Sequence, residues 1–261
     1  MRDKMRKKCA RIMLKNEREQ EILNILKVSG FVTVKILSER LFTSESSVRR
    51  DLGVLEKKGF VKRSYGGAEL LQKTTNVLPF FTRAYTDVEQ KSSIAKKAVE
   101  LIKDGSIVFI DQSSTSFFLA QEISKRQGIT IVTNNTEILN YLSDTSLCVH
   151  SSGGILSSVN RNCLIGQNAQ RTFEGIYADI VFFSSKALSD NGVISDSTQE
   201  EVFVRNSMLA NADKKVFLCS SSKFGNHSAY KQCTLNDVDY LISEDDSSLA
   251  KIKYSNFVEI I

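Results

Sequence analysis

The segment TSESSVRRDLGVLEKKG, residues 43–59, predicts an amphipathic helix close to the N-terminus of the chain. Ser44 suits the N-cap, because a serine hydroxyl can accept a hydrogen bond from an amide of the first turn. Gly59 suits the stop, and it follows two lysines that favour the negative end of the helix dipole. Apolar residues at helical spacing predict the buried stripe, namely Val48, Leu52 and Leu55. On the opposite face we expect exposed residues, namely Ser46, Arg49, Arg50 and Gly53.

Two shorter helices are predicted before this one. Residues 17–28 and 33–41 both repeat aliphatic side chains at helical spacing. After it, FVKRSYGGAEL (residues 60–70) alternates and then turns at Gly66–Gly67, which indicates a hairpin wing. Two short helices, a third helix whose outer face carries hydroxyls and adjacent arginines, and a wing are typical of a winged helix-turn-helix.

This pattern predicts a set of DNA-binding residues. Arginine can donate twice to guanine in the major groove, serine can reach several base edges, and wing cations suit backbone phosphates. The set is Ser44, Ser46, Ser47, Arg49, Arg50, Lys62 and Arg63. The alternative is a three-helix protein-interaction module whose charges form a solvated face.

Several fixed positions of this segment resemble the N-terminus of the DeoR/GlpR family of bacterial transcriptional repressors. The family pattern of an arginine followed by aliphatic residues at four-residue steps matches Arg18, Ile22 and Leu26. After a spacer of residues 27–43, the pattern continues with Ser44, Ser47, Val48, Arg49, Arg50, Asp51 and Leu52, where Ser47 replaces the family's threonine. The family's wing also matches, at Arg63 and Gly66-Gly67-Ala68. The resemblance implies a winged helix that binds duplex operator DNA.

Asp51 is a carboxylate beside two arginines and would repel phosphate. We therefore expect it to orient a neighbouring guanidinium through a charge-assisted hydrogen bond, or to accept from a donor of the second helix. A direct contact with a base is the less favoured alternative.

Composition and charge divide the chain and exclude several classes of protein. Residues 1–73 carry 18 Lys and Arg against 9 Asp and Glu, a balance of +9, whereas the remaining residues carry 17 against 21. A basic part joined to a mildly acidic one suggests a polyanion-binding domain on a separate body. The chain has 5 cysteines without a CxxC pair and 2 histidines, so we expect no disulfide framework, no metal site and a cytoplasmic location. Apolar runs are too short to span a membrane.

The rest of the chain alternates short β-rich runs with helical segments. Strands are predicted at residues 106–110, 129–133, 147–151, 179–183, 215–219 and 239–243 and in FVEII at the end, with helices near 116–126, 135–143 and 198–212. This alternation predicts an α/β domain with a doubly wound, mostly parallel sheet. Such sheets bind ligands in the loops at the carboxyl ends of their strands.

Polar residues collect in those loops, in DQSSTS, TNN, SSGG and SSSKFG. Their hydroxyls, amides and backbone N–H groups near helix N-termini suit an anion such as phosphate. The candidate effector-binding residues are Asp111, Ser113, Ser114, Thr115, Thr133, Asn134, Gly153, Gly154 and Lys223.

These loops also resemble the sensor domain of the same family, from about Arg83 to the C-terminus. Asp111, Ser114 and Thr115 match its Asp-x-Gly-Thr-Thr loop, and Ser222-Lys223-Phe224-Gly225 matches its Ser-Lys-Phe-Gly turn. The resemblance implies a ribose-5-phosphate-isomerase-like fold that binds phosphorylated sugars or polyols without turning them over. Four departures bear on the ligand: Ser113 for a glycine, Ser220 and Glu244 for aspartates, and Ser184-Ser185-Lys186 for a glycine-containing turn.

We therefore expect two domains: a basic, disordered extension at 1–15, a winged helix-turn-helix DNA-binding domain at 16–73, a linker at 74–88 and an α/β effector-binding and oligomerisation domain at 89–261. The predicted function is a cytoplasmic repressor of a carbohydrate-metabolism operon, a dimer or tetramer, without a cofactor, catalytic residues or a membrane partner. One alternative is a transcription factor with a vestigial pocket. The other is an isomerase-like enzyme, for which Asp111, Asp179 and Lys223 are candidate catalytic groups but whose strand at 179–183 continues into Ser184-Ser185 without a base.

Overall fold

The computed structural model describes residues 15–57, 60–70, 78, 80–244 and 253–261. It divides into an N-terminal unit, Met1–Thr75, and a C-terminal unit, Asn76–Ile261, each of which is treated by itself. The basic extension predicted for residues 1–15 lies outside the described residues except for Lys15. The expected helix stop at Gly59 also lies outside them, as do residues 74–77 and 79 of the expected linker.

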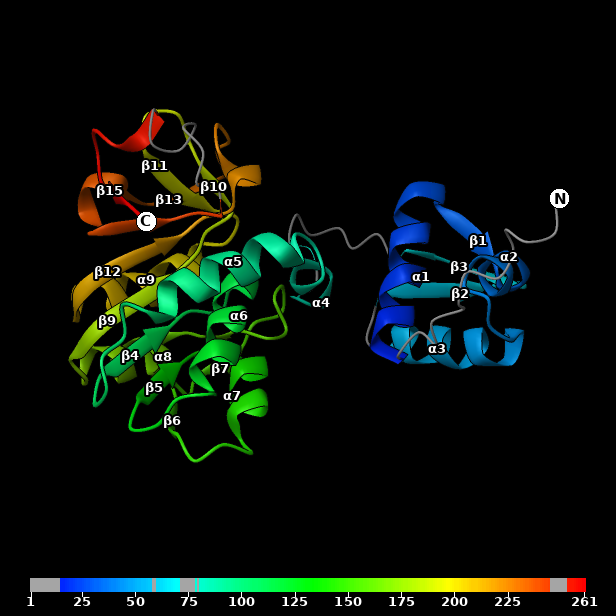
Figure 1. Ribbon diagram of the computed structural model, residues 1–261, viewed down its shortest axis with the longest axis horizontal. Coiled ribbons are helices and arrows are strands. Elements are labelled where there is room, and N and C mark those ends of the chain that lie inside the picture. Colours follow the sequence, from blue (N-terminus) through cyan, green and yellow to red (C-terminus); the bar gives the residue numbers. More distant parts are fainter. Residues whose placement is uncertain (1–14, 58–59, 71–77, 79, 245–252) are drawn as a thin grey trace, which may run out of the picture. The chain divides into compact units, whose positions relative to one another are not determined.

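The N-terminal unit is a winged helix, as predicted (Figure 1). Its elements are α1 (Lys15–Ser29), β1 (Phe31–Thr33), α2 (Val34–Arg40), α3 (Glu45–Lys57), β2 (Val61–Ser64) and β3 (Gly67–Leu70). The core joins the apolar stripes of the three helices, with Ile22, Leu26, Leu37, Val48, Leu52 and Leu55 buried. Burial of these stripes, at about 25 cal/mol per Å² of apolar area, is what holds three short helices together.

Two details of the wing differ from the prediction. The structure adds β1, which pairs with β3 to give an antiparallel sheet of order β1-β3-β2. The wing turns at Tyr65 and Gly66, whereas Gly67 is the first residue of β3. Gly66 supplies the φ of +75° that this turn needs. Gly67 is required for a different reason, because a Cβ there would lie 2.4 Å from the carbonyl oxygen of Val32.

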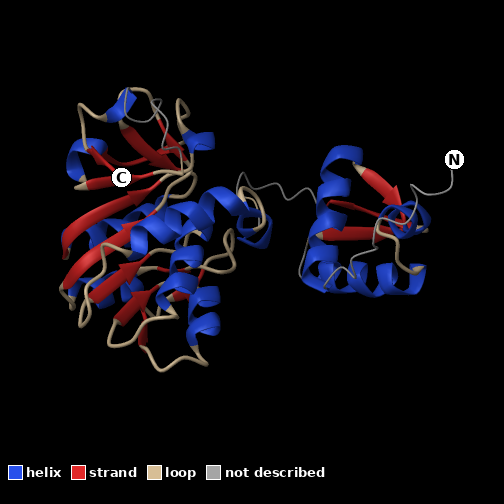
Figure 2. Ribbon diagram, in the orientation of Figure 1, coloured by secondary structure: helices blue, strands red, loops and turns tan. Residues whose placement is uncertain are grey.

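The C-terminal unit is built on a seven-stranded parallel sheet of order β15-β14-β12-β9-β4-β5-β6 (Figure 2). Its strands are β4 (Ile107–Ile110), β5 (Thr130–Thr133), β6 (Cys148–Ser151), β9 (Ala178–Phe183), β12 (Ala212–Leu218), β14 (Tyr240–Ile242) and β15 (Glu259–Ile260). The chain builds β4, β5 and β6 in one direction and then continues from β9 in the other. The strand order therefore reverses between β4 and β9, which confirms the doubly wound prediction.

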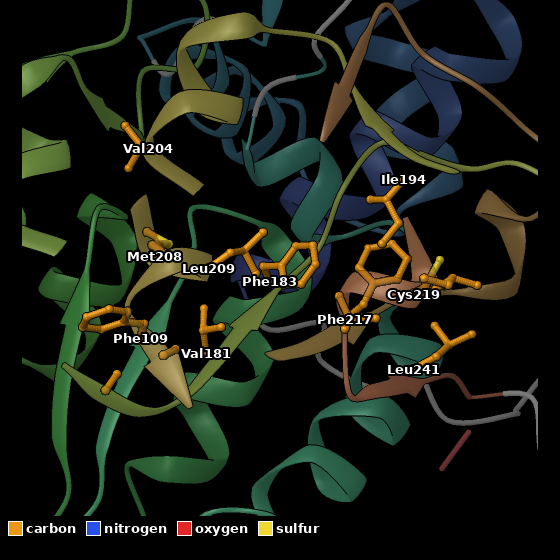
Figure 3. Packing of buried hydrophobic residues seen from close by; sticks show 14 of the residues in the cluster. Phe109, Val181, Phe183, Ile194, Val204, Met208, Leu209, Phe217, Cys219 and Leu241 are labelled. Atoms are coloured by element: carbon orange, nitrogen blue, oxygen red, sulfur yellow. The ribbon is translucent and has the colours of Figure 1, made fainter. Parts of the chain in front are cut away.

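Two buried clusters cover the two faces of this sheet. Alternate side chains of one strand enter different clusters, so Phe109 belongs to the first and Val108 and Ile110 to the second. The first cluster, part of which Figure 3 shows, packs against α8 (Gln167–Glu174) and α9 (Gln199–Ala210). The second packs against α5 (Val88–Val99), α6 (Ser114–Ile123) and α7 (Thr136–Leu142). Burial on both faces explains why the strands are continuous apolar runs.

Smaller antiparallel sheets extend the unit beyond the predicted elements. One has the order β10-β11-β13, made of β10 (Ala187–Leu188), β11 (Val193–Asp196) and β13 (Tyr230–Thr234). The other pairs β7 (Ile155–Leu156) with β8 (Leu164–Ile165). Strands of two residues carry too little periodicity to be found in a sequence.

The linker expected at residues 74–88 is too long at its C-terminal end. Residues Phe80–Ala84 form the short helix α4, and α5 begins at Val88. The Phe80 ring is buried and stands edge-on to Phe117 of α6, with the ring centroids 5.6 Å apart. Because α4 packs into the C-terminal unit, this unit starts well before residue 89.

Candidate nucleic-acid interface and ligand cavity

The outer face of α3 carries the cations that the sequence assigned to it. Arg49 and Arg50 are exposed, while Val48 before them and Leu52 after them are buried. The Ser44 hydroxyl accepts from the amide of Ser47 at 3.2 Å, which fixes the start of the helix. Arg49 also meets Glu45 one turn earlier, with 2.7 Å between Nη2 and Oε2. An exposed pair of this kind contributes little stability, so its effect is to orient the guanidinium.

The wing lies beside this face of α3. The backbone amide and the guanidinium of Arg63 both donate to the Glu56 carboxylate, at 3.1 and 2.6 Å. These two hydrogen bonds lower the pKa of Glu56. A Cβ at Gly53 would lie 3.9 Å from Arg63 Nη1, and Gly53 lies one turn beyond Arg49 and Arg50. The Arg63 guanidinium therefore holds β2 against α3, while Lys62 on the wing is exposed.

Asp51 pairs with a guanidinium, as predicted, but the partner lies on α1. Arg18 Nε donates to Asp51 Oδ2 at 2.5 Å and Nη2 donates to Oδ1 at 3.2 Å. Asp51 is buried, and its hydrogen bond raises the pKa of Arg18. Arg18 and Asp51 thus join α1 to α3, although they are 33 positions apart in the sequence.

Replacing Asp51 by alanine is expected to lower the free energy of unfolding of the N-terminal unit by about 2 kcal/mol, because two hydrogen bonds to a charged group are lost. Chemical denaturation of the full chain, followed by circular dichroism, measures this change. Glu39→Ala is the matched control, since Glu39 is exposed on α2. An equal loss of unfolding free energy in Asp51→Ala and Glu39→Ala would show that the Arg18–Asp51 pair does not stabilise the packing of α1 against α3.

The C-terminal unit holds a cavity of about 420 Å³ at the carboxyl ends of its strands. Its lining comes from the loops after β4, β9, β11 and β12, together with α4 and the start of α5. It therefore lies where the strand order reverses between β4 and β9, the usual ligand position in such sheets. Four of the nine predicted effector residues line it, namely Ser113, Ser114, Thr115 and Lys223.

The other five predicted effector residues do not line the cavity. Asp111 lies beneath it, fully buried, and binds the amide of Ser184 and the Arg205 guanidinium. Thr133 ends β5 and Asn134 follows it, on the far side of β4. The Thr133 hydroxyl accepts from the amide of Asn135, and the Asn134 amide group donates to the carbonyl of Leu164 and to the Gln112 side chain. Gly153 and Gly154 follow β6, farther still, where a Cβ at Gly154 would lie 2.5 Å from the Ile165 carbonyl oxygen. Gly154 therefore allows close packing, whereas Gly153 has open space beside it and a φ of +61°.

The N-terminus of α6 forms one wall of the cavity. Ser113 caps this helix, its hydroxyl accepting from the amide of Ser116 at 3.0 Å. The Thr115 hydroxyl is buried and has no hydrogen-bond partner among the described residues. Lys223 Nζ donates to Ser184 Oγ at 2.7 Å, and burial lowers the pKa of Lys223. The positive end of the α6 dipole, the unpartnered hydroxyl of Thr115 and the buried amine of Lys223 together form a site that favours an anion.

Beneath this wall lies a charged network around Arg205 and Glu201, two residues that the sequence analysis does not predict. Arg205, itself 1% exposed, donates from Nε to Asp111 and from Nη2 to Asp196, both at 3.1 Å. Glu201, one turn earlier on α9, accepts from Gln112 at 2.8 Å and from Asn160 at 3.1 Å. Glu201 and Arg205 line the cavity. Their spacing of four residues could have indicated a shared buried face, but the same spacing is common on solvated helices.

The contribution of Glu201 to the free energy of unfolding is expected to fall as the pH rises. Burial raises the pKa of Glu201 above its usual 4.5, as does the charge of Asp196, while Arg83, Arg205 and Gln112 act in the opposite direction. A raised folded-state pKa means that the stabilisation is present below 4.5 and is lost as the pH rises through the folded value. Glu201→Gln should remove this dependence, so the melting temperature of the wild-type chain should fall relative to the variant from about pH 4.5 upward. The Glu200→Gln control changes an exposed carboxylate, so its melting temperature should follow that of the wild-type chain at every pH. The same result for Glu201→Gln would contradict a raised pKa of Glu201 in the folded chain.

Asp179, the remaining candidate base, is not part of the cavity. Its carboxylate accepts from the amide of Ile107 at 2.7 Å, near the start of β4. The cavity lies at the other end of that strand. Among the described residues no cluster of histidine, cysteine or carboxylate side chains is arranged to hold a metal ion, and no helix there has the length and apolar character needed to cross a bilayer.

Comparison with known proteins matches both parts of the chain. A DeoR-like helix-turn-helix domain matches residues 18–74, and a DeoR C terminal sensor domain matches residues 86–245. An uncharacterized HTH-type transcriptional regulator of Bacillus subtilis, YulB, is 30% identical over 92% of this chain and 93% of its own length. The lactose phosphotransferase system repressor of Streptococcus mutans is 31% identical over 95% of this chain and its full length. Among solved structures, a ribose 5-phosphate isomerase A of Methanocaldococcus jannaschii aligns over 51% of this chain and 53% of its own, with a TM-score of 0.39 and 16% identity.

Proposed function

The chain belongs to the DeoR family of DNA-binding transcriptional regulators, and we propose that it represses carbohydrate-metabolism genes under the control of a phosphorylated sugar or polyol. The control would act through the cavity of the C-terminal unit. The named relatives are regulators and repressors, among them a repressor of a lactose phosphotransferase system. The chain is accordingly a regulator and not an enzyme.

We assign operator recognition to α3 and the wing. The exposed Arg49 and Arg50 lie on a helix of 13 residues whose other face is anchored in the core. A helix of this kind fits the major groove, where arginine reads guanine. Ser44, Ser46 and Ser47 form a hydroxyl cluster at its N-terminus, with Oγ separations of 2.9 and 3.0 Å from Ser44. The exposed Lys62 on the wing would contact a backbone phosphate.

The Thr115 hydroxyl is the observation that carries the effector proposal. A buried polar group without a partner is costly, and a bound ligand can supply the missing hydrogen bond. The phosphate would lie at the N-terminus of α6 near Lys223, and the sugar hydroxyls would face the carboxylates of Glu201 and Asp196. The cavity volume of about 420 Å³ is in the range of small-molecule sites. A vestigial pocket would leave this hydroxyl unsatisfied permanently.

We further propose that the regulator acts in the cytoplasm as a homo-oligomer. Readers of this type usually bind repeated half-sites as dimers, so two copies of the N-terminal unit would be held together by the C-terminal units. The effector would change operator affinity by shifting the population of DNA-competent oligomers. Couplings of this kind are about 1–3 kcal/mol, or roughly 5–150-fold in affinity.

Two linked measurements on the full chain test this proposal. A thermal-shift screen should show stabilisation by some phosphorylated sugars or polyols and none by the unphosphorylated forms. Mobility shift on the DNA upstream of the protein's own gene should then change when those compounds are added. Thr115→Val, which keeps the shape of the side chain, should fold normally and weaken the response. A silent screen would favour a vestigial pocket, and turnover of a sugar phosphate would overturn the assignment as a regulator.

A further inference from the structure

Phe42 occupies a backbone position that usually belongs to glycine. It follows the C-cap residue of α2 with a φ of +49°, in the left-handed region. The next amide, that of Thr43, donates to the carbonyl of Ser38 at 3.1 Å, which is the closing hydrogen bond of a Schellman motif. Glycine or asparagine adopts this conformation at low cost, whereas a bulky aromatic residue is strained in it.

The Phe42 side chain gains no burial that offsets this strain. It is 90% exposed, and Tyr65 at the wing turn is fully exposed; these are the two most exposed large apolar side chains among the described residues. Both lie in the N-terminal unit, which binds DNA. A strained and unpacked aromatic residue contributes nothing to the fold, so its contribution is to be sought in binding.

The wing turn holds Tyr65 in a fixed place. The carbonyl of Gly66 accepts from the amide of Val34 at 2.8 Å, which ties the turn to the start of α2. Gly67 packs closely against Val32 and Phe31 on β1. Tyr65 comes two residues after Arg63, whose guanidinium lies against Glu56 and next to Gly53 on α3. The wing turn is thus a rigid projection next to the recognition helix.

Phe42 is held beside the other end of the same surface. It precedes the N-cap residue Ser44 by two positions, and the N-terminal residues of a recognition helix are the ones that approach base edges. Phe42 and Tyr65 are therefore exposed on the two segments next to α3, the loop that leads into it and the wing whose Arg63 contacts it.

We propose that Phe42 and Tyr65 contact the operator directly, as apolar contacts to thymine methyl groups, deoxyribose or a partly unstacked base step. This rests on the proposed DNA-binding role of α3 and the wing. Duplex DNA is the occupant that the charges favour, because the surrounding exposed side chains include Arg49, Arg50 and Lys62 and residues 1–73 have a balance of 18 cations against 9 anions. Aromatic and apolar side chains commonly supplement such cations at DNA.

The test compares stability with DNA affinity in the same variants. Phe42→Asn accepts the left-handed backbone, so the thermal midpoint of the full chain should stay the same or rise. Its affinity for the duplex that the wild-type chain selects from a random pool should fall about tenfold, or 1.4 kcal/mol. Tyr65→Ser should leave the thermal midpoint unchanged and weaken binding by a similar factor. Gain of stability with loss of affinity is a combination that a structural role for Phe42 does not produce.

The controls separate this inference from the function on which it rests. Tyr177→Ala removes an exposed aromatic side chain of the C-terminal unit, 64% exposed, and should leave affinity unchanged. If the wild-type chain selects no duplex, the DNA-binding role itself is wrong. If it selects one and the Phe42→Asn and Tyr65→Ser variants bind that duplex as tightly, the inference is overturned. A change in oligomeric state without a change in affinity would instead assign these side chains to contacts between copies of the chain.

Discussion

Arg205→Ala is expected to lower the free energy of unfolding of the C-terminal unit by about 3–5 kcal/mol, the range found when one partner of a buried ion pair is removed. The guanidinium is buried between Asp111 and Asp196 and also donates to Gln232 at 2.7 Å. Burial by itself would lower the pKa of Arg205, but the surrounding carboxylates raise it on balance, so the side chain stays charged. Its removal leaves the fully buried carboxylate of Asp111 and the carboxylate of Asp196 at the cavity without the guanidinium that pairs with both.

Urea denaturation followed by circular dichroism measures this loss. Arg205→Lys keeps the charge but not the planar fork, so it should recover only part of the stability. Arg161→Ala is the matched control, because Arg161 is exposed in the same unit and its removal should change the free energy of unfolding by less than about 0.5 kcal/mol. Similar urea midpoints for Arg205→Ala and Arg161→Ala would mean that the fold does not need Arg205 to neutralise the carboxylates of Asp111 and Asp196.

Arg205 also determines the shape of the cavity, through Asp111. Asp111 also accepts from the amides of Ser113 and Ser184, so Arg205 fixes the carboxylate that positions the loops after β4 and β9. Loss of effector response in a folded Arg205→Lys variant is therefore expected even though Arg205 need not touch the phosphate. This is how a helix on one face of the sheet can determine the geometry of a wall built by α6.

The fold was predictable because its signals are local. The stripe Val48, Leu52 and Leu55 shows helical periodicity, and the run from Ala178 to Phe183 shows the continuous apolar character of a strand buried on both faces, each within a few residues. Phe80 was assigned to a linker because α4 is only five residues long, and its burial depends on Phe117, which is far away in the sequence. Tertiary packing of that kind leaves no periodic signal in so short a segment.

The sequence located the lining of the candidate ligand cavity only in part, through polar loops that follow predicted strands. Ser113 to Thr115 and Lys223 follow β4 and β12, the strands on either side of β9, and they line the cavity. Thr133 ends β5 and Gly153 follows β6, and the loops there are equally polar, but β5 and β6 lie on the far side of β4. Strand order across the sheet separates these two groups, and a sequence does not state strand order. The buried partners Glu201, Arg205 and Asn160 were missed because their role depends on contacts that only the fold brings together.

Arg50→Ala and Arg49→Ala are each expected to weaken binding to the selected duplex by about 1–3 kcal/mol, or roughly 5–150-fold, because in the proposed complex each guanidinium, exposed on α3, would donate to base edges of the major groove. Binding is measured by fluorescence anisotropy over a range of salt concentrations, on the selected duplex and on random duplex. If the replaced arginine contacts a base, the variant loses affinity mainly for the selected duplex, so the ratio of its affinities for the selected and the random duplex falls.

Lys62→Ala on the wing is the matched contrast to the two arginine variants. A phosphate contact neutralises charge without reading sequence, so this variant should weaken both duplexes equally and reduce the salt slope by about one unit. Glu45→Ala separates the two arginines further, since Glu45 orients Arg49 at 2.7 Å. Its removal should lower specificity if Arg49 reads a base, and should raise affinity for both duplexes if Arg49 meets phosphate, because an anion has then left the surface. Equal losses on both duplexes for Arg49→Ala and Arg50→Ala would show that α3 lies along the backbone and does not enter the groove.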